Sequence, residues 1–284
     1  MGESLMFVQF PHPGSEHRPT ESWMDWNRRD HARKFLKTHG TYISDGELRT
    51  GPFTLWGEWE PQSRVVETLP KQGRRYPRWL HEPFWQVPQH RRLLQNTDPL
   101  VFDHFLYSNC RQRRNRKLRE LAPGSLIVFG SNLEGAFVLD TVFVVSDTAE
   151  NFTGASAGDI RCADWVRAVV FEPLRMSPKS ASEIFRLYRG RSYREARAGP
   201  FSFVPCHPHG VGEYAFPRPE LRLPARWITP NLRQGAKATQ ASPADLLWLW
   251  DEIIDQVIEK AGLALGVHLA APPHGDGLRL ESAG

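Results

Sequence analysis

The strongest β-sheet signal in the chain lies at residues 118–145, which read LRELAPGSLIVFGSNLEGAFVLDTVFVV. Residues 126–129 and 136–145 are rich in β-branched and aromatic side chains, which suit the pleated surface of a strand. The six residues between them, Gly130 to Gly135, contain the glycines and the asparagine that turns favour. We therefore expect a β-hairpin with a six-residue loop.

Shorter β-strands and three helices are expected around this hairpin. The strands are predicted at residues 6–10, 55–59, 165–171 and 201–204, and the helices at 27–39, 182–188 and 242–261. Gly40 would end the first helix. Ser242 as N-cap and Pro243 at the first helical position mark the start of the last helix, which carries one apolar face. Residues 70–99, rich in proline, arginine and aromatic residues, are expected to form an ordered loop.

Length and composition indicate one folded unit. The 284 residues are 40% hydrophobic and 24% charged, which is ordinary for a globular protein. We see no repeat and no linker, so we expect a single elaborated α+β domain over residues 1–271, with residues 272–284 as a disordered tail. Ten tryptophans and 23 prolines favour loop-rich structure with aromatic-lined surfaces over a helical bundle.

The cysteines and the N-terminus bear on location. The three cysteines, at positions 110, 162 and 206, are widely spaced and show neither a disulfide framework nor a zinc knuckle. The first residues lack the basic start and apolar run of a signal peptide, and no stretch reaches the 18 apolar residues of a membrane span. These features predict a cytoplasmic protein that does not enter a membrane.

Two tryptophans and two glutamates crowd the stretch LWGEWE at residues 55–60. In a strand, Leu55 and Trp59 point to one face, and Trp56, Glu58 and Glu60 to the other. As a pocket floor, Trp56 or Trp59 would stack on a nucleobase and Glu58 would read its edge. The two glutamates could instead divide acid and base roles in catalysis. The alternative is an edge strand with a solvated outer face.

A dense positive segment follows at residues 109–121, NCRQRRNRKLREL. Guanidinium groups bind phosphate oxygens in a forked geometry, so this segment predicts contact with a nucleic-acid backbone. Two polar neighbours, Tyr107 and Asn109, could contact a base. The arginines assigned to phosphate are Arg111, Arg113, Arg114 and Arg116. The alternative is a solvated helix face anchored by its two leucines.

The combination LRELAPGSLIVFGSNLEGAFVLDTVFVV resembles the central hairpin of PUA-like small β-barrels, the group that includes ASCH and EVE domains. Leu121, Pro123, Gly124 and residues 126–128 match the family pattern, whereas Ser125 stands where an acidic residue is common. The match covers about residues 118–146. It implies a partly closed barrel with an aromatic pocket for RNA or a flipped, modified base, as in DNA-modification and bacterial defence systems. It carries over no catalytic residue.

Two further segments hold reactive side chains. The loop PCHPHG brings Cys206 and His207 together, which suits either a nucleophile with its base or part of a metal site. Any further metal ligands, such as His12, His17 or His31, are not indicated by spacing, so no metal is predicted and an unreactive loop is favoured. Arg189 in LYRGRS resembles the NAD-holding arginine of ADP-ribosyltransferases, but the following serine and glutamate motifs do not fit, which leaves a phosphate contact.

These observations favour a nucleic-acid-associated protein that recognises, and could modify, a nucleobase, with DNA or RNA as its partner. The fold we expect is a partly closed PUA-like barrel with flanking helices and a C-terminal amphipathic helix. A small-molecule or nucleotide-acting enzyme that uses Glu58 and Glu60, or Cys206 and His207, is the alternative. A tryptophan-rich scaffold is a third. No cofactor motif is present, and the sequence leaves turnover and oligomeric state open.

Overall fold

The computed structural model describes residues 2–19, 26–27, 32–87, 94–196, 199–209, 215–230, 232 and 235–276, together with the backbone of residues 23–24. Strands make up 41% of the chain and helices 18%, so it is a mixed α+β protein dominated by sheets.

The strands are β1 Met6–His12, β2 Trp23–Met24, β3 Arg33–Ser44, β4 Glu47–Glu58, β5 Ser63–Thr68, β6 Trp79–Pro83, β7 Leu106–Tyr107, β8 Leu126–Leu133, β9 Ala136–Thr153, β10 Ile184–Gly190, β11 Val204–Pro208, β12 Lys237–Gln240 and β13 Ala264–Leu269. The helices are α1 Asp164–Val166, α2 Glu172–Met176, α3 Tyr193–Ala196 and α4 Pro243–Asp255, with 3₁₀ turns η1 Arg116–Arg119 and η2 Ala155–Asp159 and π-helical turns η3 Arg167–Phe171 and η4 Gln256–Lys260.

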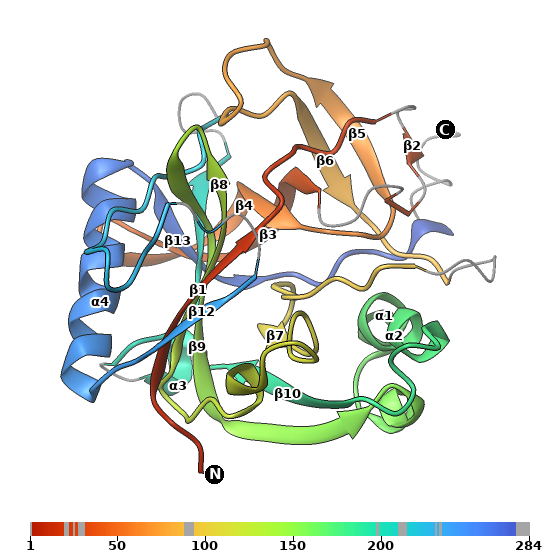
Figure 1. The fold of residues 1–284 in the computed structure, drawn as a ribbon. Helices are drawn as coiled ribbons and strands as arrows, with labels where there is room; N and C mark the ends of the chain where they lie inside the picture. The colour runs from red at the N-terminus through yellow and green to blue at the C-terminus, as the bar shows by residue number, and fades with distance from the viewer. Residues whose placement is uncertain are drawn as a thin grey trace.

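The strands form two sheets (Figure 1). The six-stranded sheet has the order β12-β1-β8-β9-β10-β7, and the seven-stranded sheet has the order β13-β11-β4-β3-β6-β5-β2. β1 pairs with β8 in parallel, whereas β8 and β9 form an antiparallel hairpin. A bridge between Val142 on β9 and Phe203, just before β11, joins the two sheets.

The hairpin predicted at residues 126–145 is confirmed, but the expected six-residue loop is wrong. The turn consists of Glu134 and Gly135, which have φ of 53° and 81°, the left-handed pair of a type I′ turn. Gly130, expected in the loop, lies inside β8 at a register shift. A Cβ on Gly130 would lie 2.1 Å from the carbonyl oxygen of Val138, so only glycine allows the two strands this close.

A closed ring of strand pairings occurs in the seven-stranded sheet. β13 pairs with both β11 and β3, β11 pairs with β4, and β4 pairs with β3 along its whole length. The segment that resembles PUA-like domains, residues 118–146, lies in the other sheet and takes no part in this ring. The PUA-like barrel therefore stays a prediction.

Two hydrophobic clusters fill the molecule, and the strands between them are buried on both faces. On β1, Phe7 points into one cluster while Val8 and Phe10 point into the other. On β8, Leu126 and Val128 alternate with residues 127 and 129 in the same way. Double burial explains why these strands read as continuous apolar runs.

The C-terminal helix is confirmed as α4, continued by η4 to Lys260. Ser242 Oγ accepts a hydrogen bond from the backbone N–H of Asp245, whose carboxylate accepts one from the Ser242 N–H, which is a capping box. The apolar face, with Leu246, Leu249 and Ile253, packs into one of the two clusters. Figure 1 shows α4 along one side of the molecule and α1 and α2 on the other.

Three other predicted elements are wrong. Residues 33–39, expected as part of a helix, belong to β3, and residues 28–31 lie outside the described residues. Residues 165–171, expected as a strand, form helical turns, and 184–188, expected as a helix, form β10. In the first case Arg33 and Lys34 are buried, so charge did not mark a solvent face. At residues 165–171, a helix buried nearly all round gives the same apolar run as a buried strand.

Smaller differences concern strand ends and loops. β1 continues through Pro11 to His12, and the expected loop at 70–99 contains β6. β11 begins at Val204, where the predicted strand was to end, and includes Cys206 and His207. Pro273 and Gly275, in the expected tail, hydrogen bond with the backbone of Trp85, and residues 277–284 lie outside the described part. None of the described helices has the length and apolar character needed to cross a bilayer.

Gly40, predicted as a helix cap, is instead a close-approach glycine in the middle of β3, and this position can be tested. A Cβ on Gly40 would lie 2.0 Å from the carbonyl oxygen of His268 on β13. Gly40→Ala should lower the free energy of unfolding by at least about 2 kcal/mol, because the β3–β13 pairing must open. Gly51, its direct partner on β4, is the control, since its nearest neighbour is 3.9 Å away. Urea unfolding should show Gly51→Ala near wild type; equal losses in both variants would contradict the close approach.

Candidate functional site

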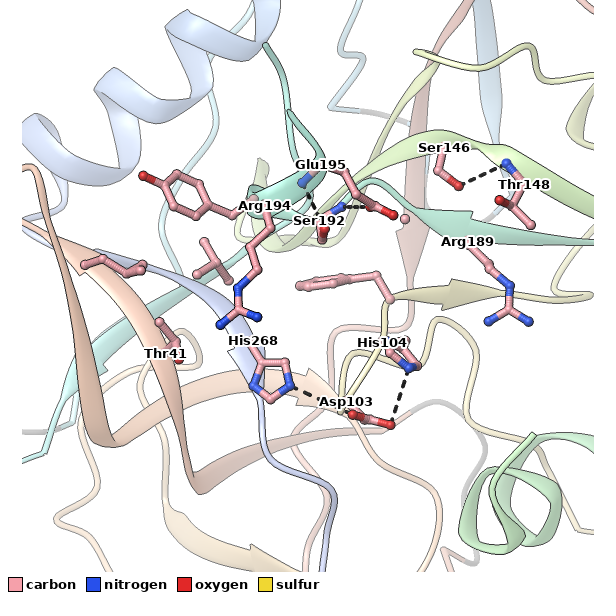
Figure 2. Close-up of a pocket in the computed structure, with 15 residues that line it drawn as sticks. Thr41, Asp103, His104, Ser146, Thr148, Arg189, Ser192, Arg194, Glu195 and His268 are labelled. Atoms are coloured by element: carbon pink, nitrogen blue, oxygen red, sulfur yellow. Dashed lines mark hydrogen bonds and ion pairs between the residues drawn. The ribbon is translucent and has the colours of Figure 1, made fainter. Parts of the chain in front are cut away.

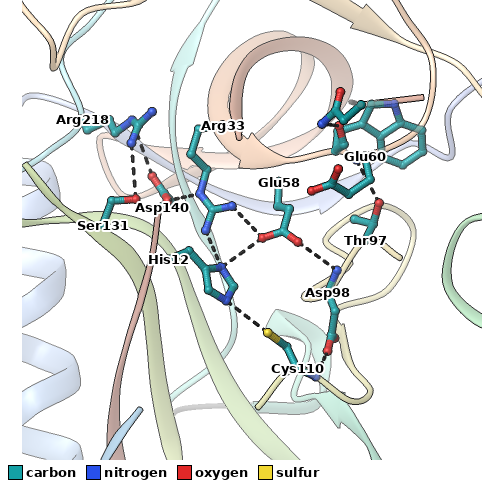
Figure 3. Close-up of polar contacts among 12 residues, drawn as sticks. His12, Arg33, Glu58, Glu60, Thr97, Asp98, Cys110, Ser131, Asp140 and Arg218 are labelled. Atoms are coloured by element: carbon teal, nitrogen blue, oxygen red, sulfur yellow. Dashed lines mark hydrogen bonds and ion pairs between the residues drawn. The ribbon is translucent and has the colours of Figure 1, made fainter. Parts of the chain in front are cut away.

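Charged side chains are buried where the two sheets meet, and we call this group the buried polar centre (Figure 3). Its members come from β1, β3, β4, β9 and the loop at residues 98–110, and they are His12, Arg33, Glu58, Asp98, Cys110 and Asp140. Taking each ionised group out of water costs several kcal/mol, so charges are rarely buried together without a function or a compensating partner.

Arg33 holds the centre together. Its Nη1 donates to Glu58 Oε2 at 2.6 Å and its Nε donates to Asp140 Oδ2 at 2.7 Å. Burial alone would lower the pKa of Arg33, but the two carboxylates outweigh it and raise the pKa above its ordinary value. The guanidinium is therefore a permanent positive charge that bridges β4 of one sheet and β9 of the other.

A second buried guanidinium, that of Arg218, covers the ring of Trp56. It lies 4.2 Å from the ring centroid, and its Nε is 4.0 Å from Asp140 Oδ1. Burial lowers the pKa of Arg218 to about 10. Asp140 thus stands between two arginines, and the Trp56 ring face that a base would need is occupied by a cation.

His12 connects Glu58 to a cysteine. His12 Nδ1 lies 3.0 Å from Glu58 Oε2, and His12 Nε2 lies 3.5 Å from the Sγ of Cys110. Arg33 Nη2 also faces Nδ1, at 2.5 Å. When Nδ1 carries the proton it donates to Glu58, and the Nε2 lone pair faces the thiol; when Arg33 donates to Nδ1, the Nε2 proton faces the sulfur. The tautomer whose Nδ1 proton goes to Glu58 is therefore the one in which the imidazole can take a proton from Cys110 and return it.

Asp98 fixes the turn that carries Cys110. Its carboxylate accepts backbone N–H bonds from Ser108 at 2.7 Å, Asn109 at 2.8 Å and Cys110 at 2.5 Å. Burial raises the pKa of Asp98 to about 6 in spite of these bonds, and the nearby charge of Glu58 adds to the rise. The three hydrogen bonds hold the half-buried Cys110 against His12.

A neighbouring group of buried polar residues lies on the other side of β4. Lys34 Nζ donates to the carbonyl oxygen of Pro61 at 2.9 Å, and burial lowers its pKa to about 7. Ser63 Oγ lies 3.1 Å from His81 Nδ1, and burial, with the charges of Lys34 and His17, lowers the pKa of His81 to about 2. These side chains form the polar surroundings of the centre.

The predicted pocket floor at residues 55–60 is interior. Trp56 and Trp59 are 1% and 0% exposed, so neither has the open face that base stacking needs. The alternative of an edge strand with a solvated outer face is wrong as well, because these residues are buried. The Trp59 indole N–H donates to the carbonyl oxygen of Gln62, and its ring packs edge-on against Phe102. Glu58 belongs to the buried polar centre, while Glu60 lies on the side of Lys34, so the two carboxylates do not form a pair.

Two other predicted residues join the centre through the Cys110 turn. Tyr107 is fully buried and its hydroxyl donates to the carbonyl oxygen of Cys110 at 2.7 Å. Asn109 Oδ1 accepts hydrogen bonds from Asn96 Nδ2 and Ser108 Oγ. The structure therefore brings Glu58, Tyr107 and Asn109 into one region, as the base-reading hypothesis required, but with their polar atoms turned toward the protein.

The Cys206 and His207 pair does not form a reactive site. Cys206 is buried inside β11, and burial raises the pKa of its thiol well above the ordinary value. The His207 Nδ1 faces the carbonyl oxygen of Pro208 at 3.1 Å. Among the described residues, no group of three or more His, Cys, Asp or Glu side chains is arranged to hold a metal ion; His31 lies outside them.

The predicted phosphate-binding arginines lie on the surface, except that Arg111 is partly buried beside Cys110 and has a φ of 61°. Arg113 pairs with Glu183 and Arg116 with Glu120 at 3.0 Å and 2.8 Å, while their side chains stay more than half exposed. Arg114 is exposed. Arg189 lies apart from this run, at the far end of β10, where it lines a cavity (Figure 2).

The sequence did not indicate His12, Arg33, Asp98, Cys110 or Asp140 as one site. Arg33 was expected on a helix, and His12 was one of several arbitrary metal ligands. The pairs that make the centre are separated by between 12 and 107 residues along the chain, so no local pattern could relate them. The one local signal was the unusual density of charge and tryptophan around Glu58.

The ion pairs of Arg33 predict a large stability effect. Arg33→Met removes the guanidinium that pairs with both buried carboxylates, which leaves Asp140 with Arg218 at 4.0 Å and Glu58 beside His12, and should lower the free energy of unfolding by about 3–5 kcal/mol. Arg49→Met is the matched control, since Arg49 pairs with Glu47 at 3.1 Å but is 45% exposed, and should cost less than about 1 kcal/mol. Chemical denaturation followed by tryptophan fluorescence measures both. Similar small losses would show that the buried pairs contribute little.

His81 predicts a pH dependence of stability. Because its folded pKa of about 2 lies below the ordinary 6.5, the unfolded chain binds the extra proton more readily, and stability is lost as the pH falls below about 6.5. The loss from this group is about 1.4 kcal/mol per pH unit. His81→Asn should remove that part of the slope between pH 6.5 and 4.5, while His39→Asn, at an exposed position, should keep the wild-type slope. Parallel profiles for all three proteins would contradict the assignment.

Comparison with known proteins adds no family for this chain. No protein-family model matches it. No curated protein and no solved structure shows a significant similarity to it. Its function has therefore to be inferred from the chemistry of its own residues, of which the buried polar centre holds the most concentrated set.

Proposed function

We propose that the protein is an enzyme that uses the Cys110 thiol as a nucleophile toward a nucleobase, with His12 as general base and Glu58 as the group that orients His12. One observation carries the proposal: the Cys110 Sγ lies 3.5 Å from His12 Nε2 and the His12 Nδ1 lies 3.0 Å from Glu58 Oε2, so the imidazole connects the thiol to the carboxylate. A nucleophile, a base in reach and a third group that orients the base are the parts of nucleophilic catalysis.

The protonation state of Cys110 defines how this centre would work. Burial, followed by the charges of Asp98 and Glu58, raises the pKa of the thiol well above its ordinary value. The resting residue is therefore a thiol and not a preformed thiolate, and it needs a base at the moment of attack. His12 supplies that base, and Glu58 stabilises the imidazolium that results.

In the proposed step, the sulfur of Cys110 forms a bond to an electrophilic carbon of the base. The electron pair of the attacked double bond moves onto a carbonyl oxygen of the substrate, and the thiol proton passes to Nε2 of His12. While the adduct stands, the carbon next to the attacked one has enolate character and can exchange its hydrogen with solvent. Return of the proton from Nε2 to the sulfur and cleavage of the S–C bond then release a base with an exchanged hydrogen and restore the enzyme. Arg33 does not touch the reacting atoms and acts as a positioning residue that sets the orientation of Glu58.

The arginine run supports a nucleic acid as the substrate. Arg111 follows Cys110 directly, and the exposed Arg113, Arg114 and Arg116 extend from that point over the surface. A phosphate backbone held by these guanidinium groups would pass close to the thiol. A second candidate function is recognition of DNA or RNA without turnover, which the exposure of the arginines favours equally.

Cys110→Ala tests the enzymatic proposal. Wild-type protein is incubated in deuterium oxide with single- and double-stranded DNA and RNA, and the nucleosides released by digestion are analysed by mass spectrometry for an exchanged base hydrogen or a protein adduct. Removing the nucleophile should lower the rate by at least about 100-fold, because nucleophile and base act together. Cys162→Ala, at the other partly exposed cysteine, should keep the wild-type rate.

A second readout separates chemistry from folding and from binding. The rate of Cys110 alkylation by iodoacetamide should fall in His12→Asn. The double variant Arg113→Met with Arg114→Met should keep the wild-type alkylation rate, but it should bind oligonucleotides more weakly and with a smaller salt dependence. Unchanged alkylation in folded His12→Asn protein would remove His12 as the base. Activity that persists in Cys110→Ala would overturn the proposal, and binding without any product would leave recognition as the function.

A further inference from the structure

The cavity that Arg189 lines is separate from the buried polar centre. It encloses about 610 Å³, which is in the range of pockets that hold a nucleotide-sized ligand. Its walls come from β3, β4, β9, the tip of the segment at residues 98–110, the end of β10, α3 and β13. Figure 2 shows Arg194 pointing toward His268, Asp103 between two histidine rings, and Arg189 on the far side.

The wall formed by the loop tip is held in a defined position. Leu100 and Leu106 exchange both of their backbone hydrogen bonds, and the N–H of Gly190 donates to the carbonyl oxygen of Phe105 at 2.8 Å. A Cβ on Gly190 would lie 2.5 Å from the Cβ of Phe105, so glycine is needed for the loop to lie against β10. Asp103, at the tip, has a φ of 59°, and such strain in a non-glycine residue is common at binding sites.

The charges in the cavity leave the two arginines available. The Asp103 carboxylate lies between His104 Nε2 at 3.6 Å and His268 Nε2 at 3.8 Å. The Glu195 carboxylate accepts a hydrogen bond from the backbone N–H of Ser192 at 2.8 Å, which is the main reason that its pKa is lowered. The Glu195 carboxylate is therefore engaged by the backbone of Ser192, whereas the two histidines offset the charge of Asp103 only when they are protonated.

The guanidinium groups, by contrast, are weakly engaged. Arg189 Nη2 lies 4.0 Å from Glu150 Oε1, at the limit of an ion pair, and its side chain is 38% exposed. Arg194 makes no hydrogen bond or ion pair with any residue in the described part of the chain. Two such cations over one cavity attract an anion, and their forked donors match phosphate oxygens.

We propose that this cavity binds a phosphate-bearing ligand of nucleotide size, with Arg189 and Arg194, which lie on opposite sides of the cavity (Figure 2), contacting its anionic groups. The hydroxyl groups of Ser146, Thr148 and Ser192 line the same cavity and can donate to further oxygens. The Tyr193 ring, 38% exposed, offers an apolar surface for the rest of the ligand. The site is new with respect to the thiol centre and does not depend on Cys110 being a nucleophile.

The loop at residues 98–110 connects the two sites. Its base carries Asp98 and Cys110 in the buried polar centre, and its tip carries Asp103 and His104 in the cavity. The backbone of Asp103 is fixed by its N–H, which donates to the carbonyl oxygen of Leu269 at 2.7 Å. A ligand in the cavity therefore contacts the same loop that positions the thiol.

Isothermal titration calorimetry of the whole chain tests the proposal with inorganic pyrophosphate, AMP and adenosine as probes. Pyrophosphate and AMP should bind, and adenosine should bind at least 10-fold more weakly because it has no phosphate. Arg189→Met with Arg194→Met should raise the Kd for AMP at least 10-fold. Arg222→Met, an exposed arginine outside the cavity, should leave the Kd unchanged.

Three results would overturn this assignment. One is no heat with pyrophosphate or AMP at millimolar concentration, and the second is equal affinity for AMP and adenosine. The third is wild-type affinity in the double variant, which would place the anion elsewhere. Far-ultraviolet circular dichroism and the unfolding midpoint of the double variant show whether a loss of binding reflects misfolding. If either changes, the double variant Arg189→Lys with Arg194→Lys, which keeps both charges, replaces it. This lysine variant should bind AMP more weakly than wild type but more tightly than the double methionine variant. The rate of Cys110 alkylation, measured on the same samples, reports on the thiol centre. Loss of AMP binding with an unchanged alkylation rate therefore concerns the cavity alone.

Discussion

The guanidinium of Arg33 is the interaction on which the interior depends. It lies between Glu58 on β4 and Asp140 on β9, so one positive charge ties the seven-stranded sheet to the six-stranded sheet. Uncompensated, each of these charges would cost several kcal/mol to bury. One guanidinium and two carboxylates carry one net negative charge, which the guanidinium of Arg218, 4.0 Å from Asp140, offsets. The two hydrogen bonds of 2.6 Å and 2.7 Å have the short lengths of charge-assisted pairs.

This constraint determines what the neighbouring groups can do. Glu58 is held by Arg33, and His12 is held by Glu58, so the imidazole has one fixed direction in which to present Nε2. Asp98 independently holds the backbone of Cys110 in that direction. A centre fixed by ion pairs on one side and by backbone hydrogen bonds on the other needs little reorganisation when a proton moves, which is the condition for efficient general-base catalysis.

Local elements of the fold could be predicted where the deciding contacts are close in sequence. The α4 helix follows from a capping box within four residues and an apolar stripe at helical spacing, and the β8–β9 hairpin follows from two adjacent β-rich runs with a glycine-containing turn. The predicted helix before Gly40 is wrong because the charged residues at its start are buried and do not mark a solvent-exposed face. Arg33 and Lys34 are among the most buried side chains in the protein.

By itself, the sequence determined that this is a mixed α+β protein, that residues 243–255 form a helix, and that the stretch around Glu58 is chemically unusual. Only the tertiary structure decided which partners Glu58 has and that Cys110, not Cys206, faces a histidine. The physical reason is chain separation: His12 and Cys110 are 98 residues apart, and Arg33 and Asp140 are 107 apart. Periodicity and capping act over a few residues, whereas a buried charge finds its counter-ion only when the sheets have packed.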